Sequence, residues 1–501
     1  MLKPLKLADE ARLILSNLGD AASDLAVPSL RLGVTGLARA GKTVFLSALV
    51  HNLIHGGRLP LFQAAASGRL TRAALQPQPD DAVPRFDYEA HVAALVNDRI
   101  WPQSTRQISE LRLTLEYESA SYLARKLGPG KLHLDLIDYP GEWLLDLPLL
   151  RQSFGEFSRK ALQLARAANR REIAAPYLET LTSIDPEGPE TELDAQKLAA
   201  TFTDYLAACR SETMALSMLP PGRFLMPGDL AGSPALTFAP LDIAEDAPPA
   251  RTGTFRAMME RRFEAYKNHV VRPFFRDHFA RLDRQIVLVD VLHALNAGPH
   301  ALADLQDALN EVLVSFRPGK RSWLSSILTR RIDRILFAAT KADHLHREDH
   351  DRLQAILRRL VARGMDHAEY RGARVEALAL AAVRATREGT IPRDGEDLPV
   401  ILGTPLPGQS MEGRALSPDK EIALFPGDLP QNPDSLFETL DSLSEDAAHS
   451  VSAGTGTEAG DHAFLRFRPP HLEAGPGGLT LSLPHIRLDR ALEFLIGDRL
   501  T

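Results

Sequence analysis

The sequence predicts a mixed α/β fold with a mainly parallel sheet, and three observations support this. The string GLARAGKT (36–43) stands between an apolar run and an apolar helical pattern. The strings at 108–119 and 131–141 read as two neighbouring strands of an antiparallel hairpin. After residue 284, short apolar runs alternate with helical patterns, as in a parallel sheet with right-handed crossovers.

The composition limits the class of protein. The chain has 501 residues, of which 44% are hydrophobic, so it can form two to four domains or one core with large insertions. The net charge of −7 gives no global basic field, and no nucleic-acid partner is expected. The single Cys209 excludes an intrachain disulfide framework and a cysteine-based zinc site, which fits a reducing compartment.

The chain divides into five parts by pattern. Residues 1–28 form an N-terminal amphipathic helix, 29–142 the first part of an α/β core, 143–280 a mainly helical insertion, 281–390 the second part of the core, and 391–501 a C-terminal extension ending in a helix. The first helix is expected to pack on the protein itself, with a membrane surface or a partner as the alternative. No apolar window is long enough for a transmembrane helix.

Two parts of the core carry further expectations. The hairpin of 108–119 and 131–141 is predicted to lie at one edge of the sheet. The polar stretch of about 58–108 exceeds usual loop lengths, so helices are expected within it.

The string GLARAGKT fits the phosphate-loop pattern G-x-x-x-x-G-K-[ST] in the context of strand, loop and helix. Its glycines let backbone N–H groups turn inward as an anion nest, and the helix N-terminus adds positive potential. Lys42 is predicted to reach the β- and γ-phosphates, and the Thr43 hydroxyl to ligate Mg²⁺. Nucleotide contacts are assigned to Gly36, Ala38, Arg39, Ala40, Gly41, Lys42, Thr43 and Val44.

The string DYPG follows an apolar strand and predicts a switch. Asp138 can hold the Mg²⁺ shell through water, and the Gly141 N–H can contact a γ-phosphate. Glu142 stands where Ras-like enzymes carry the glutamine that orients water. It could polarise water, but its charge near phosphate suggests slow turnover; a solvated carboxylate is the alternative.

The string WPQSTRQ predicts a second switch before the hairpin. Thr105 is the expected ligand to Mg²⁺ and γ-phosphate, and Ser104 is the alternative ligand. A hydroxyl that only caps a helix or stabilises a turn is the non-functional explanation. Arg39 or Arg106 could act as an arginine finger in cis. For each of them, a solvated surface arginine is the alternative.

The string TKAD, residues 340–343, resembles the guanine-binding pattern N-K-x-D. The Asp343 carboxylate would accept from the two donors on the Watson–Crick edge of guanine, a pair that adenine lacks. The Lys341 stem would cover the base plane. Thr340 replaces the asparagine that usually ties this loop to the phosphate loop.

The string LALAAVRAT follows the next predicted strand. A short loop of small residues there can offer a backbone N–H to guanine O6. Ala381, Ala382 and Val383 are the candidates, and the sequence does not choose among them. Simple packing at the end of the strand is the alternative.

Taken together, these strings resemble the YcjX-like family of bacterial P-loop GTPases, which are also described as predicted ATPases. The strings that carry the resemblance include LIDYPGEWLLDLPLL, AATKADHL, LFPGDLP and PHIRLDRALEFLIGDRL. The resemblance covers nearly the whole chain. It implies a GTPase core interrupted by a helical domain, an envelope-stress role and a membrane-protein partner of the YcjF type. Carried to this sequence, nucleotide contacts fall on Gly41, Lys42, Thr43, Thr105, Asp138, Gly141, Lys341 and Asp343.

The expected fold is therefore a P-loop NTPase core of the Ras-like GTPase kind, with a helical insertion and a C-terminal extension. The expected function is slow hydrolysis of GTP to GDP with Mg²⁺ by a nucleotide-dependent switch, with Lys42, Thr105, Gly141 and Glu142 as catalytic residues. An ATPase of the same fold and a nucleotide-stabilised scaffold are the alternatives. A cytoplasmic location is expected, with peripheral association at the inner membrane as the variant. The sequence leaves the oligomeric state open.

Overall fold

The computed structural model describes residues 27–37, 39–103, 107–121, 129–211, 213–315, 332–370, 372–393, 396–411, 414–437, 465–472 and 482–501. The predicted N-terminal helix lies outside these residues except for its last two positions. Ala38 and the predicted switch residues Ser104, Thr105 and Arg106 also lie outside them.

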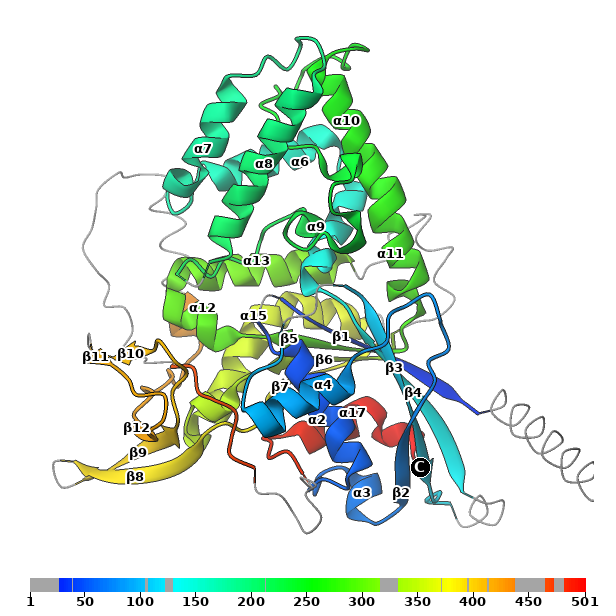
Figure 1. The fold of residues 1–501 in the computed structure, drawn as a ribbon, viewed down its shortest axis with the longest axis vertical. Helices are drawn as coiled ribbons and strands as arrows, with labels where there is room; N and C mark the ends of the chain where they lie inside the picture. The colour runs from blue at the N-terminus through cyan, green and yellow to red at the C-terminus, as the bar shows by residue number, and fades with distance from the viewer. Residues whose placement is uncertain are drawn as a thin grey trace, which may run out of the picture.

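A seven-stranded sheet forms the centre of the molecule (Figure 1). Its strand order is β2-β3-β4-β1-β5-β6-β7. In the order from β4 to β7, all neighbouring strands are parallel. Strand β3 runs antiparallel to both of its neighbours, β4 and β2. This is the mainly parallel α/β sheet that the alternating pattern predicts. The strands are β1 (Ser29–Gly36), β2 (Leu70–Gln76), β3 (Ser109–Tyr117), β4 (Gly130–Asp138), β5 (Arg284–Val289), β6 (Arg334–Ala339) and β7 (Arg374–Ala379).

Both faces of the sheet are buried, which explains why its central strands read as continuous apolar runs. In β6, Leu336 and Ala338 belong to the core on one face, and Ile335 and Phe337 belong to the core on the other. This alternation follows from the period of two along a strand. The sheet thus separates two apolar layers.

Helices cover both faces. Helix α2 (Lys42–Ile54) and the C-terminal helix α17 (Leu488–Ile496) pack on one face. Helices α13 (Pro299–Ser315) and α15 (His350–Tyr370) pack on the other face, with α12 (Val291–Ala297) beside α13. The position of α2 directly after β1 places its N-terminus at the carboxyl end of a central parallel strand, where α/β folds bind ligands.

The predicted hairpin of β3 and β4 is present, but its position at the sheet edge is not. Strand β2 pairs antiparallel with β3 and forms that edge instead. The sequence conceals β2 because only Ala73 of its seven residues is buried. The long stretch around it also contains the expected helices, α3 (Gln63–Ala66), α4 (Tyr88–Ala93) and the π-helix η1 (Ala94–Asp98).

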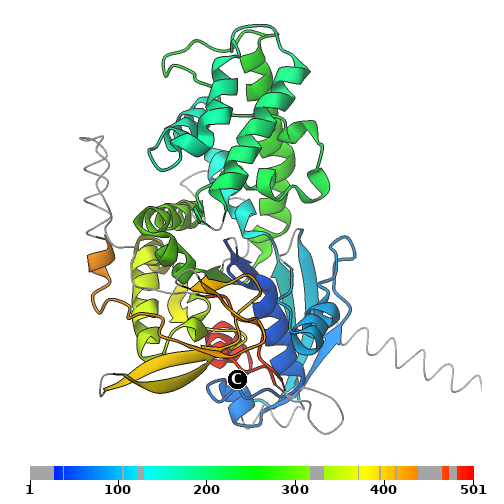
Figure 2. The ribbon, with the colours of Figure 1, turned by 60° about the vertical axis from the view of Figure 1, so that its left-hand side comes forward.

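Residues 154–281, here called the helical segment, stand above the sheet (Figures 1 and 2). Its first helix begins at a capping box in which Ser153 and Glu156 satisfy each other's backbone N–H groups. Aromatic rings form its centre, among them Phe157 stacked on Phe263 at 5.0 Å. Its elements are α6 (Phe154–Ala165), α7 (Arg171–Thr182), α8 (Glu192–Cys209), α9 (Gly222–Leu225), η3 (Gly228–Leu230), η4 (Pro234–Leu236), α10 (Phe255–Tyr266), η5 (Lys267–Val271), α11 (Arg272–Asp277) and η6 (Phe279–Arg281).

One 3₁₀ element, η2 (Gly141–Arg151), connects β4 to the helical segment and follows directly on the DYPG string. We call it the switch II element. The loops after β6 contain the 3₁₀ turns η7 (Ala342–His344) and η8 (Arg347–Asp349).

After residue 386 the chain contains strands that were not predicted from the sequence. A three-stranded antiparallel sheet has the order β12-β9-β8, and a second sheet pairs β10 with β11. Prolines inside β8 and β9, at Pro392 and Pro399, hide these strands from pattern reading. The bounds are β8 (Arg387–Arg393), β9 (Glu396–Gly403), β10 (Ser410–Met411), β11 (Arg414–Ala415) and β12 (Ile422–Leu424); η9 (Gly497–Arg499) ends the chain.

Among the described residues, none of the helices has both the length and the apolar character that crossing a membrane requires.

Candidate functional site

A cavity of about 370 Å³ lies at the carboxyl ends of the central parallel strands. It brings together the phosphate loop and two loops that are predicted to contact the base of a nucleotide. The first base loop is TKAD, residues 340–343, and the second is the loop of residues 381–383 after β7. Both lie some 300 residues after the phosphate loop in the chain. Most of the predicted nucleotide contacts line it: Arg39, Ala40, Gly41, Lys42, Thr43, Val44, Lys341, Asp343, Ala381, Ala382 and Val383.

The phosphate loop has the backbone shape that an anion nest needs. Arg39 and Gly41 have φ angles of 63° and 79°, so the chain turns through left-handed conformations before α2 begins at Lys42. The Lys42 ammonium donates to the Gly36 carbonyl at 2.9 Å and therefore lies along the loop. The Thr43 hydroxyl donates to the Gln103 carbonyl at 3.3 Å, which places residue 103, part of the WPQSTRQ string of the second predicted switch, beside the start of α2.

The first base loop is fixed by hydrogen bonds at both ends. Lys341 has a φ of 62°, and its ammonium forms an ion pair with Asp290, the residue that caps α12. Asp343 is buried, and its Oδ2 accepts from the Ala385 N–H at 2.8 Å. Because one carboxylate oxygen is held by the next loop, the orientation of the Asp343 side chain is set before any ligand binds.

Thr340 stands where the guanine-binding pattern has asparagine. Its N–H donates to the Val289 carbonyl at 2.9 Å, and its hydroxyl donates to the same carbonyl at 3.4 Å. The side chain therefore ties this loop to the end of β5. The usual link to the phosphate loop is replaced by a link to a neighbouring strand.

The second base loop follows β7. The N–H of Ala381 donates to the Ile486 carbonyl at 3.1 Å, and the Ile486 N–H returns to the Ala381 carbonyl at 2.8 Å. Within the described residues, the N–H groups of Ala382 and Val383 show no such acceptor. Of the three candidates, these two can donate to a ligand without losing a bond of the fold.

Side chains that the sequence analysis did not assign complete the cavity. Trp101 donates its indole N–H to the Phe467 carbonyl at 2.7 Å. The Phe467 ring is 1% exposed and meets the His344 ring edge-on at 5.5 Å. Burial lowers the pKa of His344, so the imidazole is neutral at pH 7. Two far-separated segments thus close the base end of the cavity, which Pro102, Leu406 and Arg466 also line.

The DYPG residues adjoin the phosphate loop and its strand, although they are not among the residues that line the cavity. Asp138 ends β4, is buried, and stands in register with Val34 of β1. A Cβ on Gly141 would lie 1.9 Å from the carbonyl oxygen of Gly36. Only glycine fits there, because the switch II backbone rests directly on the first residue of the phosphate loop.

Glu142 is 4% exposed and forms a 2.6 Å ion pair with Arg210. The alternative of a solvated carboxylate is therefore wrong. Arg210 is the C-cap of α8 in the helical segment. Nothing in the sequence pattern connects these two residues, which lie 68 positions apart in the chain.

The donor set suits a magnesium ion bound with a nucleotide. Mg²⁺ prefers hard oxygen ligands and is commonly held by one or two protein groups plus phosphates. The Thr43 hydroxyl lines the cavity, and the Asp138 carboxylate ends the strand beside the phosphate-loop strand. These are the two ligand types that the sequence analysis assigns to the ion.

Comparison with known proteins agrees with this geometry. The profile of the YcjX-like family, DUF463, matches residues 30–500. The chain is 38% identical over 482 residues to a protein of Escherichia coli (strain K12) named Ras-like GTPase YcjX, covering 94% of this chain and 96% of that protein. It is 34% identical over 491 residues to a protein of the same name from Shewanella oneidensis, covering 94% of each.

Proposed function

Because the chain belongs to the YcjX-like family, we propose that it binds GTP with Mg²⁺ and hydrolyses it slowly to GDP and phosphate as a nucleotide-dependent switch. The observation that carries this proposal is the single cavity that joins a phosphate loop to a buried, oriented Asp343. The names of the relatives support the same class of activity.

The base end of the cavity supports a guanine nucleotide. Guanine presents two donors, N1–H and N2–H₂, to a carboxylate, and adenine presents no such pair. The Ala385 N–H donates to Oδ2 of Asp343 and so fixes the orientation of this carboxylate. An N–H of Ala382 or Val383 would complete recognition by donating to O6.

The phosphate end supports hydrolysis. Water attacks the γ-phosphorus and releases a proton to solvent, the bond from that phosphorus to the β–γ bridging oxygen breaks, and its electron pair leaves with GDP. The Lys42 ammonium neutralises charge on the β- and γ-oxygens, and the Gly141 N–H contacts the γ-phosphate. Mg²⁺ held by Thr43 and Asp138 would neutralise phosphate charge further. Glu142 takes the place of the glutamine that orients water in Ras-like enzymes, and its carboxylate is held by Arg210, which favours slow intrinsic turnover.

Nucleotide affinities test the base preference. Purified protein is titrated with fluorescent GDP and ADP, and tighter binding of GDP is expected. The Asp343→Asn variant is expected to lose at least about tenfold in GDP affinity, since a charged hydrogen-bond pair is removed, and to gain affinity for the xanthine nucleotide.

The matched control is Asp351→Asn, the same change at a carboxylate that pairs on the surface with Arg487. It should leave GDP binding unaltered. Tighter binding of ADP by the wild type would support the ATPase alternative, and an unaltered GDP affinity in Asp343→Asn would remove Asp343 from the site. A stress role with a YcjF-type membrane partner is proposed from the family resemblance alone.

A further inference from the structure

The switch II element is pressed between the phosphate loop and the helical segment by backbone contacts on both sides. On one side, a Cβ on Gly141 would meet the Gly36 carbonyl oxygen at 1.9 Å. On the other side, a Cβ on Gly222, the first residue of α9, would meet the Glu142 carbonyl oxygen at 1.8 Å. Three backbones are therefore stacked with no side chain between them, and a shift of one displaces the next.

A buried carboxylate holds the helical segment onto this stack. Asp146 of the switch II element accepts from the Gly222 N–H at 2.8 Å and from the Arg223 N–H at 3.3 Å. The Tyr266 hydroxyl of α10 donates to the same carboxylate at 2.6 Å. One side chain thus binds two different elements of the helical segment.

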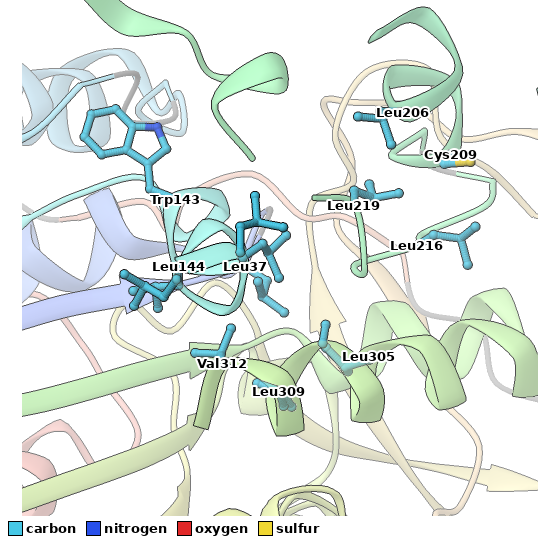
Figure 3. Close-up of a cluster of buried hydrophobic side chains, with 14 of the residues drawn as sticks. Leu37, Trp143, Leu144, Leu206, Cys209, Leu216, Leu219, Leu305, Leu309 and Val312 are labelled. Carbon is cyan, nitrogen blue, oxygen red and sulfur yellow. The ribbon is translucent and has the colours of Figure 1, made fainter. Parts of the chain in front are cut away.

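Trp143 makes a second attachment beside the first. The Arg223 guanidinium lies 3.2 Å from the centroid of its ring, and the indole N–H donates to the Met226 carbonyl at 3.0 Å. In Figure 3, Leu37 of the phosphate loop lies beside Leu144 of the switch II element. Side chains of the helical segment and of α13 belong to the same apolar cluster: Leu206, Cys209, Leu216, Leu219, Leu305, Leu309 and Val312.

The third attachment is ionic and lies next to Gly141 in the chain. Arg210 forms its 2.6 Å ion pair with Glu142, the residue that directly follows Gly141. Arg210 also lines a small cavity of about 30 Å³ together with Leu37 and Arg39 of the phosphate loop. One guanidinium thus faces both the switch II element and the loop that is proposed to hold the phosphates.

We propose that Arg210 is a positioning residue through which the helical segment reads the nucleotide state. It holds Glu142, and so the Gly141 N–H, in the closed arrangement in which switch II rests on the phosphate loop. This arrangement keeps Gly141 next to the carbonyl that receives Lys42, at the phosphate end of the site. The closed arrangement therefore favours a triphosphate over a diphosphate. The inference rests on the proposed GTP site.

The charge of Arg210 explains why it has this role. Glu142 is buried, and a buried carboxylate without its partner is strongly disfavoured. If Arg210 is removed, the Glu142 side chain moves toward water and draws Gly141 away from Gly36. With Arg210 present, the pair is neutral and adds no repulsion to bound phosphates. The role of Arg210 thus depends on the charge of Glu142, which makes it separable from simple packing.

The test measures the affinities of GDP and of a non-hydrolysable GTP analogue with Mg²⁺ for the full-length chain. Arg210→Ala is expected to weaken binding of the GTP analogue about tenfold and to leave GDP binding within about twofold. Glu142→Gln added to Arg210→Ala is expected to restore most of the lost affinity, because a neutral side chain no longer needs the guanidinium. Arg210→Lys should keep part of the preference.

The matched control is Arg166→Ala, which removes a 2.5 Å ion pair with Asp242 on the surface of the same helical segment. It should change neither affinity. Equal losses of GDP and GTP-analogue binding in Arg210→Ala would show a merely structural role and overturn the inference, as would a double variant without rescue. If the wild type bound neither guanine nucleotide, the proposed function would fail instead.

Discussion

The two ends of the nucleotide cavity are built in different ways. At the phosphate end, glycine backbones of the phosphate loop, switch II and the helical segment touch, and the carboxylates behind them are buried and paired. At the base end, loops hold one another through hydrogen bonds, such as that from Trp101 to Phe467 and the pair between Ala381 and Ile486. Packed backbones have few alternative arrangements, whereas loops joined by a few hydrogen bonds can separate. The phosphate end therefore suits a two-state switch, and the base end suits entry and release.

The strongest test of the phosphate end is Lys42→Ala. The ammonium is predicted to neutralise the β- and γ-oxygens, so its loss should lower phosphate release between about 100-fold and 1000-fold. Phosphate release is measured with wild type and variant at equal nucleotide saturation. Release that does not depend on Lys42 would favour the scaffold alternative, in which the nucleotide only stabilises the fold.

Gly222→Ala should break the contact between switch II and the helical segment. The added Cβ would meet the backbone of Glu142, which cannot yield as a flexible side chain does. We expect a loss of about 3 kcal/mol in the free energy of unfolding, measured by denaturant titration. Gly155→Ala, whose Cβ would meet only the end of Arg159 at 3.6 Å, is the control and should not destabilise. Equal stabilities of both variants would contradict the close contact.

Asp146 makes the same junction sensitive to pH. Burial raises the pKa of Asp146 to about 6, above its usual value of 3.8. The folded state thus binds the Asp146 proton more tightly than the unfolded state does. The contribution of Asp146 to the free energy of unfolding is therefore full below about pH 4 and declines as the pH rises toward about 6. Between about pH 4.5 and pH 7.5, wild type should lose about 2 kcal/mol relative to Asp146→Asn. Denaturant unfolding at both pH values checks this, and parallel pH profiles would contradict it.

Trp101→Phe should give the smallest effect and act only at the base end. It keeps the ring but removes the N–H that bonds to the Phe467 carbonyl. Loss of about 1 kcal/mol would speed GDP release about fivefold, measured by stopped-flow with a fluorescent analogue. The preference for GTP analogue over GDP should stay constant. An altered preference would mean that the two ends are not separate.

Much of the fold was predictable because its signals are local. The glycines and Lys42 of the phosphate loop, the alternation in β3 and β4, and the apolar runs of β5 and β6 lie within single short strings. Strand β2 was missed because only one of its seven residues is buried, and the β8–β9 hairpin was missed because each of its strands contains a proline. The edge position predicted for the β3–β4 hairpin was wrong because β2 pairs with β3.

The candidate site was predictable to the same extent. The strings identify Lys42, Lys341 and Asp343, which do line one cavity. They do not identify Phe467, whose role depends on a hydrogen bond to Trp101 across the chain. Nor do they identify Arg210, since its only signal is a charge at the end of a helix. Long-range partners of this kind have no spacing that a sequence pattern could reveal.

The central position of β1 has a consequence for synthesis on the ribosome. Its neighbour β5 is far away in sequence: the Arg31 N–H bonds to Asp283, 252 residues later. At about 5 to 20 residues per second, the nascent chain waits roughly 13 to 50 seconds between the two strands. During this interval β1 exposes an unpaired apolar edge, while the helical segment is translated and can fold. The cavity at the ends of these strands can form only after that delay, so the helical segment is made before the sheet that carries the cavity is complete.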